Sequence, residues 1–388
     1  RLYVCKSISP LIFCILVFDK NNKNSKNSRL MKTQGTKINF TGQNVYAGID
    51  IHLKSWKVTI MVNEREHKTF SQDSSAELLF NYLKKNFPGA TYYSAYEAGF
   101  CGFSAHRELK DFGIHNIVVN PADIPTTDKE KKQKEDKRDS RKIVKSLKNG
   151  DLIGIYVPSK EMEELRGLVR YRKTLVKEIT RHKCRIKSFL YLNGIKIPLE
   201  KEVASQHWSG RFTQWLKDID LSTMEGKMVL HDTIDTVDFL RKKLLNINKH
   251  LRQIGKEGKY AMRLRLLQSI PGIGLINAIT LLSEMEDVLR FKNFDRLCSF
   301  IGLVPSTNSS GDKEIVGRIT RRSNRNLRSV LIEAAWVASR KDPSLMYSYG
   351  QLCTRMDPNE AIIRIAKKLL NRIRYVMKNE KEYVLSVI

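Results

Sequence analysis

Two long segments with helical spacing of apolar residues constrain the fold of this chain most strongly. Apolar residues alternate at intervals of three and four over 228–255, with Leu240 or Arg241 filling one gap of seven, and 159–193 has a looser, strongly basic version of that pattern. The apolar positions are Met162, Leu165, Val169, Val176, Ile179, Ile186 and Leu190 in the first segment, and Leu230, Ile234, Val237, Leu244, Ile247, Leu251 and Ile254 in the second. The pattern predicts two long helices that form an antiparallel hairpin, an intermolecular coiled coil, or simply two packed helices of one domain.

The residues before these helices alternate between strand and helix character. Residues 45–51 (VYAGIDI) and 56–62 (WKVTIMV) are strand-like and are joined by a short polar turn, which indicates a hairpin. The other predicted elements are strands near 67–70, 92–96 and 116–120, and helices over 75–86, 106–112 and 136–147. This order is typical of a ribonuclease-H-like domain, although the pattern alone does not separate it from other α/β folds.

The chain is predicted to be mostly helical from about residue 260. Residues 264–270 and 275–284 have helical character and flank the tight turn Pro271-Gly272-Ile273-Gly274. A helix-hairpin-helix-like turn of this kind can direct backbone N–H groups at a phosphate, so Gly272 and Gly274 are candidate nucleic-acid contacts. The turn is not a dinucleotide-binding motif, because a third glycine and a preceding strand are missing. No G-x-x-x-x-G-K-[ST] motif is present to imply ATP.

The charge of the chain points to a polyanionic partner. There are 69 Lys and Arg residues against 41 Asp and Glu residues, a formal net charge of +28. Self-repulsion of this size disfavours a compact state unless a polyanion is nearby, and nucleic acid is the commonest one. An anionic membrane surface is disfavoured, because there is no basic amphipathic helix with aromatic anchors. The longest apolar run, 11–18 (LIFCILVF), is also much shorter than the roughly 20 residues of a membrane span.

The N-terminal residues and the cysteines indicate the cellular setting. Residues 1–44 are expected to be a leader or a disordered extension, because the first methionine is Met31 and the apolar run is not followed by an A-x-A-like cleavage site. The six cysteines include no C-x-x-C pair, which argues against a zinc site or a disulfide framework. Reduced thiols of this kind predict a cytoplasmic protein.

Four carboxylates in a particular order suggest a metal site. Asp50 lies inside an apolar strand, and Glu97 comes directly after one, at its carboxyl end. Asp136 and Asp139 are three residues apart, hence on one face of a predicted helix. Taken singly, each is more often a structural or solvated carboxylate. Together they form the kind of oxygen-rich cluster that suits Mg²⁺.

These acids lie in segments that resemble a known family. VYAGIDIH (45–52), YEAGFCG (96–102) and KEDKRDSRKI (134–143) resemble the catalytic domain of the DEDD-type insertion-sequence transposases, which are related to the Piv-type DNA invertases. That resemblance implies a RuvC-like fold in which Asp50, Glu97, Asp136 and Asp139 are the catalytic Mg²⁺ ligands. The family has Thr before the first Asp of the pair and Ala after the second. Here those residues are Glu135 and Ser140, so Glu135 is an additional candidate ligand.

The C-terminal part of the chain carries the second half of this resemblance, over about 260–345. Ser310, followed by Gly311 after a G-L-x-P segment, matches the serine that in this family is thought to attack DNA and form a phosphoserine link. The family's R-G-N is Arg322-Ser323-Asn324 here. From the residues alone, Ser309 and Ser310 belong to a polar turn, and a serine is a weak nucleophile unless a base, cation or metal activates it. The basic run 317–328 supplies candidate nucleic-acid contacts, namely Arg318, Arg321, Arg322, Arg325 and Arg328.

The resemblance also implies partners. Recombinases of this family choose their donor and target DNA with a noncoding RNA, and they assemble as homo-oligomers, a dimer or a tetramer, in which acids of one subunit complete the serine site of another. Ser310 is expected to displace a 3′-hydroxyl and to keep the phosphate as a covalent ester.

The predicted organisation is therefore an extension (1–44), a RuvC-like DEDD catalytic domain (45–150), a helical coiled-coil or linker region (151–258) and a C-terminal serine transposase domain (259–388). The predicted function is that of an RNA-guided, Mg²⁺-dependent transposase. The alternatives are a metal-only RuvC-like endonuclease or junction resolvase, and a catalytically decayed protein that only binds nucleic acid.

Overall fold

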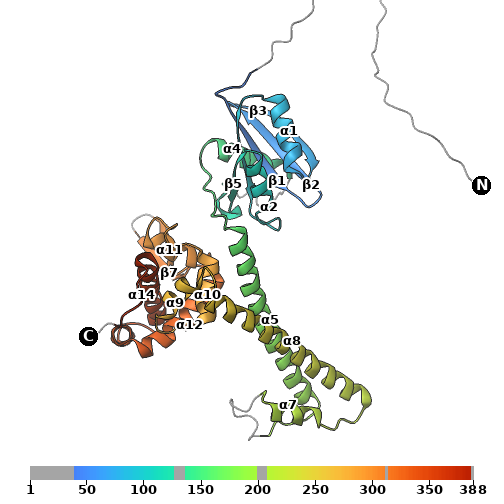
Figure 1. The fold of residues 1–388 in the computed structure, drawn as a ribbon, viewed down its shortest axis with the longest axis vertical. Coiled ribbons are helices and arrows are strands. Elements are labelled where there is room, and N and C mark those ends of the chain that lie inside the picture. The colour runs from blue at the N-terminus through green and yellow to red at the C-terminus, as the bar shows by residue number, and fades with distance from the viewer. Residues whose placement is uncertain (1–38, 126–135, 199–207, 311–312, 386–388) are drawn as a thin grey trace, which may run out of the picture. The chain divides into compact units, whose positions relative to one another are not determined.

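The described residues form two compact units, divided between Val157 and Pro158 (Figure 1). The computed structural model describes residues 39–125, 136–198, 208–310 and 313–385. The predicted extension therefore lies almost wholly outside the described residues, as does Glu135.

A five-stranded sheet in the order β3-β2-β1-β4-β5 forms the centre of the first unit. Its strands are β1 (Asn44–Ile51), β2 (Ser55–Val62), β3 (Arg65–Asp73), β4 (Thr91–Glu97) and β5 (His115–Val119). The first three pair antiparallel as consecutive neighbours, whereas β4 runs parallel to β1 and β5 runs parallel to β4. The prediction of a mixed α/β unit is confirmed, and the ribonuclease-H-like assignment remains a prediction.

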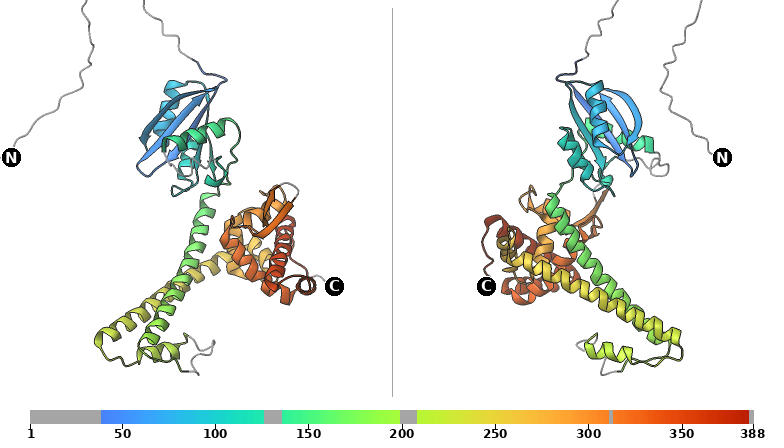
Figure 2. Two further views of the ribbon diagram at one scale, coloured as in Figure 1. Left: turned by 180° about the vertical axis from the view of Figure 1, so that it is seen from behind. Right: turned by 45° about the vertical axis from the view of Figure 1, so that its right-hand side comes forward.

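Helices cover both faces of this sheet (Figure 2). They are α1 (Ala76–Asn86), α2 (Ser104–Asp111), the short 3-10 helix η1 (Pro121–Asp123) and α4 (Asp136–Lys148). Ala47 and Ile49 of β1 are buried in one apolar cluster with residues of α1 and α2. Gly48 points to the other face because side chains alternate along a strand, and there it meets α4.

Two helices of 33 residues each, α5 (Lys160–Leu192) and α8 (Met224–Lys256), run through the second unit. Leu190 near the end of α5 shares a cluster with Leu230 near the start of α8. Leu165 and Leu251, at the opposite ends, share another. The two helices therefore pack antiparallel within one chain, as the predicted hairpin requires (Figure 2). An intermolecular coiled coil remains a prediction.

The sequence between these helices shows no readable pattern, but it contains α7 (Gly210–Lys217). Phe212 and Leu216 of α7 are buried against α5 and α8, and Trp208 and Trp215 pack around them. The ends of the two long helices thus enclose a small apolar core of their own.

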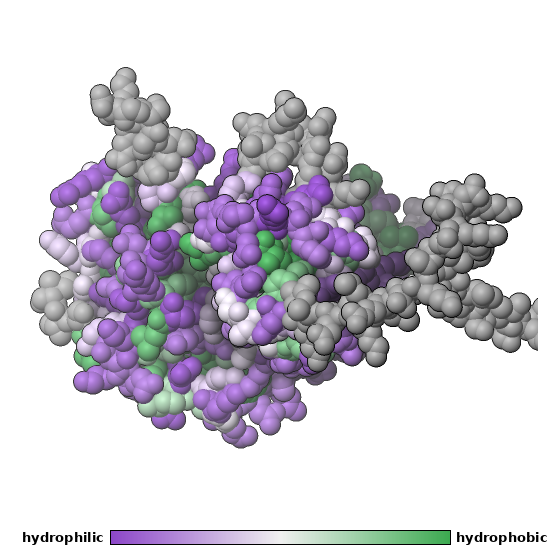
Figure 3. All heavy atoms as spheres, turned by 90° about the horizontal axis from the view of Figure 1, so that it is seen from above, coloured by the Kyte–Doolittle hydropathy of each residue, from purple (hydrophilic) through white to green (hydrophobic). Residues whose placement is uncertain are grey.

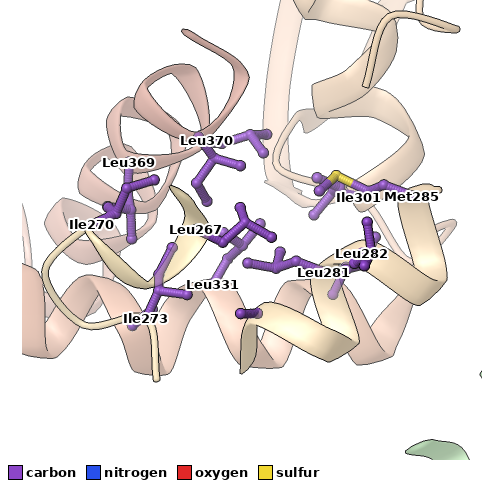
Figure 4. Close-up of a cluster of buried hydrophobic side chains, with 14 of the residues drawn as sticks. Leu267, Ile270, Ile273, Leu281, Leu282, Met285, Ile301, Leu331, Leu369 and Leu370 are labelled. Carbon is purple, nitrogen blue, oxygen red and sulfur yellow. The ribbon is translucent and has the colours of Figure 1, made fainter. Parts of the chain in front are cut away.

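The rest of the second unit is a helical bundle with one β-hairpin. Its elements are α9 (Ala261–Gln268), α10 (Leu275–Met285), α11 (Phe294–Ile301), β6 (Pro305–Ser310), β7 (Lys313–Ile319), α12 (Arg325–Lys341), α13 (Pro343–Cys353) and α14 (Pro358–Asn379). Leu267, Leu281, Leu331 and Leu370 meet in its core (Figure 4). Because the first half of α5 contributes to the same core, the regions predicted as 151–258 and 259–388 are joined in one unit from residue 158 onward.

The surface is dominated by hydrophilic side chains on the face shown in Figure 3, where hydrophobic residues form only small patches. Among the helices of the described residues, none combines the length and the apolar character needed to cross a lipid bilayer.

Candidate active site

Asp50 and Glu97 occupy matching positions on neighbouring parallel strands. The register of β1 and β4 pairs Ile49 with Tyr96, and each acid is the next residue along its strand. Matching residues of parallel neighbours point to the same face, and adjacent strands are about 4.8 Å apart. Both acids share the face of Gly48, two residues before Asp50 and on the side of the sheet covered by α4. The structure thus brings these two predicted ligands together at the carboxyl edge of the sheet.

Helix α4 packs very closely on β1 at Gly48. A Cβ atom on this residue would lie 2.2 Å from the carbonyl oxygen of Ser140 and 2.6 Å from the backbone nitrogen of Val144. The Ser140 hydroxyl also lies 2.8 Å from the Thr59 hydroxyl of β2, in a buried contact. Only glycine permits this approach, so Gly48 and Thr59 together fix the height of α4 over the sheet.

Two contacts give the direction of α4. Ser140, in its second turn, lies over Gly48. Lys148, its last residue, forms an ion pair of 2.5 Å with Glu64 in the turn that joins β2 to β3, near the amino end of β1. Helix α4 therefore runs antiparallel to β1, and its first turn lies towards the carboxyl edge of the sheet.

The backbone of Asp136 and Asp139 consequently lies near the carboxyl edge of the sheet, where Asp50 and Glu97 are. Asp136 opens α4 one turn before Ser140, a rise of about 6 Å. Asp50 lies two residues beyond Gly48, about 6.6 Å along the strand. The side chain of Asp136 is outside the described residues, so the four-ligand site remains a prediction. Among the side chains that are described, no three His, Cys, Asp or Glu residues are grouped to hold a metal ion.

A histidine that the sequence analysis did not consider adjoins these acids. His52 Nε2 lies 3.1 Å from Asp50 Oδ2, while the Asp50 side chain is 21% exposed. Asp50 is therefore partly accessible from solvent.

The predicted serine nucleophile lies at the end of a β-hairpin. Strand β6 continues through Ser310, and the ladder with β7 pairs Ser309 with Glu314 and Ser310 with Lys313. The side chains of both serines are outside the described residues, so the choice between them remains open. A rival nucleophile in this unit, the Cys298 thiol, is unsuitable because burial raises its pKa to about 11.

The motifs around the hairpin pack directly on one another. Gly302 of the G-L-x-P segment has φ +83°, and a Cβ atom there would lie 2.2 Å from the Cβ of Ser323. The backbone nitrogen of Asn324 donates to the Phe300 carbonyl at 3.0 Å. Glycine at 302 is therefore required both by its left-handed conformation and by the space available. The base of the hairpin is fixed to the start of α12.

Ser323 replaces the glycine usual at this point in the family, but its backbone does not need glycine. Positive φ at non-glycine residues of the described chain occurs only at Asn63, Trp208, Glu286 and Glu380. The Ser323 hydroxyl is, however, buried without a hydrogen-bond partner among the described residues. Serine at this position therefore leaves the backbone unstrained but adds one buried polar group without a partner among the described residues.

The predicted nucleic-acid contacts fall into two kinds. Arg318, Arg321, Arg322 and Arg325 are exposed. Arg328 is half-buried, and its guanidinium donates to the carbonyl oxygens of Thr320 at 2.7 Å and Gly302 at 3.4 Å. Arg328 thus stabilises the hairpin base, whatever role it has with DNA.

The glycine turn between α9 and α10 forms as predicted, but its two glycines differ. Gly272 has φ +86°, and a Cβ atom there would lie 2.3 Å from the carbonyl oxygen of Ala334 in α12. Gly274 has open space around its Cβ position and is the N-cap of α10. Gly272 is thus required for helix packing, and Gly274 is the better placed of the two to offer its backbone to a phosphate.

Glu284 of α10 is a key residue that the sequence analysis missed. Its side chain is 1% exposed, and it accepts two hydrogen bonds from Arg170 of α5, at 2.7 and 2.8 Å. The Asn324 side chain, which caps α12, donates to it at 2.8 Å, and Asn326 donates at 3.3 Å. One buried carboxylate therefore joins α5, α10 and the start of α12. Its signal in the sequence was a single acid at the end of an apolar helix.

The pKa of Glu284 reflects this network. Burial by itself would raise it, but the hydrogen bonds from Arg170 and Asn324 and the charges of Arg170 and Arg166 bring the pKa below its ordinary value. The carboxylate is ionised at neutral pH and fixes the position of Asn324, the third residue of the Arg322-Ser323-Asn324 motif.

Comparison with known proteins finds two matching family models. Residues 47–193 match the DEDD transposase model of the IS110 type, and residues 264–351 match the family described as Transposase IS116/IS110/IS902. The chain is 27% identical over 244 residues to a putative transposase, y4qE, of Sinorhizobium fredii, a match that covers 63% of this chain and 58% of that protein.

Two further relatives are matched over more of their length. The transposase for insertion sequence element IS1533 of Leptospira borgpetersenii is 25% identical, with 75% of this chain and 84% of the relative covered. The transposase for IS1111A of Coxiella burnetii is 25% identical, with 73% and 77% covered. The chain belongs to the IS110/IS116 family of DEDD transposases.

Proposed function

We propose that this chain cuts and rejoins DNA at the ends of an insertion sequence, acting in the cytoplasm as a site-specific recombinase. The observation that carries the proposal is the matching position of Asp50 and Glu97 on parallel strands, with the first turn of α4 at the same edge of the sheet. This arrangement gathers acids that are distant in the sequence, as phosphoryl transfer at a metal site requires.

The donor set suits Mg²⁺. Asp50, Glu97, Asp136 and Asp139 offer only carboxylate oxygens, the hard ligands that this ion prefers. A bound Mg²⁺ would neutralise charge on the phosphate to be cut and so make it easier to attack. The partial exposure of Asp50 leaves room for the phosphate beside the ligands.

Ser310 acts as the nucleophile in this proposal. Its oxygen forms a bond to phosphorus while the bond from phosphorus to the 3′-oxygen breaks, so the 3′-hydroxyl leaves protonated and the serine loses its proton. The phosphate remains as an ester on Ser310. Attack by a 3′-hydroxyl reverses the step and rejoins a strand, so no ATP is consumed. Arg318 and Arg321 are exposed and lie close to Ser310 in the sequence, so they can bind the phosphates that flank the cut.

A noncoding guide RNA and a homo-oligomer belong to the same proposal. The acids and the serine lie in different units of the chain, so a second copy can supply either group. The basic helix α5 offers cations along much of its length for a nucleic-acid backbone.

Trapping the covalent intermediate tests this function. A radiolabelled DNA containing an element end would be incubated with the full chain, its guide RNA and Mg²⁺, and adducts would be scored on denaturing gels. Wild type should form a protein–DNA adduct, Ser310→Ala should form none, and Ser309→Ala should retain it. The reverse result for the two serines would assign the nucleophile to Ser309.

The other outcomes identify the alternatives. Cleaved ends without an adduct, still dependent on Asp50, would replace the proposal with a metal-only nuclease or junction resolvase. Binding without cleavage, unchanged by Asp50→Asn, would indicate a decayed element protein.

A further inference from the structure

Helix α14 has one buried face and one cationic face. Ile365, Leu369 and Ile373 lie in the core of the bundle. Arg364, Lys367, Lys368 and Asn371 follow at intervals of three, one and three residues, which places them together on another side of the helix.

This cationic face borders a pocket of about 370 Å³. Phe294 at the start of α11 and Leu352 near the end of α13 complete its lining. Lys367 Nζ lies 5.9 Å from the centre of the Phe294 ring. Lys368 Nζ donates to the Ser348 hydroxyl at 2.9 Å, so its ammonium group is held in place. The volume falls at the low end of the range typical of small-ligand sites.

No carboxylate among the described residues neutralises the cations of the pocket by direct contact. Its lining contains three cations and no carboxylate. Among the described residues, no acid forms an ion pair with Arg364, Lys367 or Lys368. Asp295, next to Phe294, is exposed and does not line the pocket. An anionic ligand would therefore be attracted here.

The apolar wall narrows the choice of anion. A phosphate alone would use the cations and leave Phe294 and Leu352 in contact with water. A nucleotide would use both, because its base stacks on an aromatic ring while its phosphates meet Lys and Arg. Asn371 adds an amide that can hydrogen-bond a base edge. A paired base is already stacked in its duplex, so the ligand that fits is an unpaired nucleotide.

We propose that the pocket formed by α11, α13 and α14 binds one unpaired nucleotide of a single-stranded nucleic acid, its base on Phe294 and its phosphates on Arg364, Lys367 and Lys368. That nucleic acid is the ligand rests on the proposed function. The pocket itself is separate in the sequence from the four acids and from the serine hairpin.

Fluorescence anisotropy with the full chain tests this site. The probes are eight-nucleotide oligo(dT) and oligo(U), together with an abasic backbone of the same length, in buffer without divalent metal. Lys367→Gln should weaken all three probes and lower the salt dependence of binding, since about one phosphate contact is lost. Phe294→Leu should weaken the base-bearing probes at least about fivefold and leave the abasic probe unchanged.

Two variants control for charge and folding. Lys378→Gln removes the same charge from the same helix, about 16 Å further along its axis. This variant should bind oligo(dT) and oligo(U) as tightly as wild type does, whereas Lys367→Gln should bind them more weakly. Asn371→Trp fills the pocket from an exposed position and should reproduce the Phe294→Leu effect without removing a packed side chain.

Oligo(U) and oligo(dT) differ in the 2′-hydroxyl and in the 5-methyl group of the base, so oligo(dU) is measured beside them. Tighter binding of oligo(U) than of oligo(dU) indicates RNA, and the reverse indicates DNA. The proposal is overturned if Phe294→Leu and Asn371→Trp bind all probes as wild type does. It is also overturned if both variants weaken binding of the abasic probe as much as binding of the base-bearing probes. Since the assay contains no divalent metal and scores no cleavage, it can fail while covalent adducts still form.

Discussion

The position for a Cβ atom on Gly48 lies 2.2 Å from the carbonyl oxygen of Ser140. This contact joins the strand that carries Asp50 to the helix that carries Asp136 and Asp139. The predicted metal site therefore depends on a residue with no side chain.

Replacing Gly48 by alanine should displace α4. The added methyl group meets backbone atoms, which cannot rotate away, so the free energy of unfolding should fall by about 1–3 kcal/mol. Hydrogen–deuterium exchange should show faster exchange in α4. Gly167→Ala is the control, because Gly167 is an exposed residue of α5 with open space around it. This substitution should raise the free energy of unfolding by up to about 1 kcal/mol. Unchanged protection of α4 in Gly48→Ala would contradict this account of the packing.

Glu284→Gln should destabilise the second unit. The variant leaves Arg170 without its charge partner, so the free energy of unfolding should fall by about 3 kcal/mol. This value is at the low end for a buried ion pair, because the Arg170 side chain is half exposed. Glu164→Gln, at an exposed position of α5, should change stability by less than about 0.5 kcal/mol. Urea unfolding measures both.

The pH dependence of the same comparison follows from the lowered pKa of Glu284. A carboxyl group whose pKa is lower in the folded state stabilises the fold above its unfolded pKa, which is about 4.3. That stabilisation is lost as the pH falls through the folded value. The stability difference between wild type and Glu284→Gln should be constant from pH 6 to 8 and shrink below about pH 4.3. A difference that stayed constant down to pH 3 would show that the charge of Glu284 is not what stabilises the unit.

Ser323→Ala should stabilise the chain. Its hydroxyl is buried without a partner among the described residues, and such a group costs about 1–3 kcal/mol. Since the backbone of Ser323 does not require glycine, alanine fits without strain. We expect a higher melting temperature by differential scanning calorimetry. Ser329→Ala, which removes a hydroxyl that accepts a hydrogen bond from Lys173, should have the opposite sign. A destabilised Ser323→Ala would reveal a partner for the hydroxyl.

Substitution of Arg328 and of Arg325 should distinguish an arginine that stabilises the fold from one that binds nucleic acid. Arg328→Ala removes the donor to two carbonyl oxygens at the hairpin base and should cost about 1–3 kcal/mol of stability. Arg325→Ala should leave stability unchanged and reduce the salt slope of DNA binding by about one phosphate contact. Thermal unfolding and binding at several salt concentrations measure the two effects, and equal effects of the two variants on both would contradict the assignment.

Regular periodicity predicted most of the fold. The strands of the first unit and both long helices lie within a few residues of their predicted positions, because a buried face imposes a repeat of two or of about 3.6 residues on the sequence. The antiparallel packing of α5 and α8 could not be chosen in advance, since the same spacing suits pairing within a chain or between chains. Helix α7 was missed because it is short and its apolar residues are mainly aromatic.

The site was only partly predictable from the sequence. Asp50 was identifiable as an acid inside an apolar strand and Glu97 as an acid at the carboxyl end of one, and the structure brings them together. Glu284 was not identifiable, because its partners Arg170 and Asn324 lie 114 and 40 residues away and only folding brings them into contact. Arg328 was grouped with its exposed neighbours, because composition does not distinguish an arginine that binds phosphate from one that binds carbonyl groups.

Binding of Mn²⁺, a paramagnetic substitute for Mg²⁺, tests the central claim most directly. Electron paramagnetic resonance would measure free Mn²⁺ in titrations of the full chain and of Asp50→Asn, Glu97→Gln, Asp136→Asn and Asp139→Asn, with Asp295→Asn as an exposed control. The account predicts one site in wild type, weakened at least about tenfold by each of the four substitutions and unchanged by the control. Wild-type affinity in all four variants would contradict it.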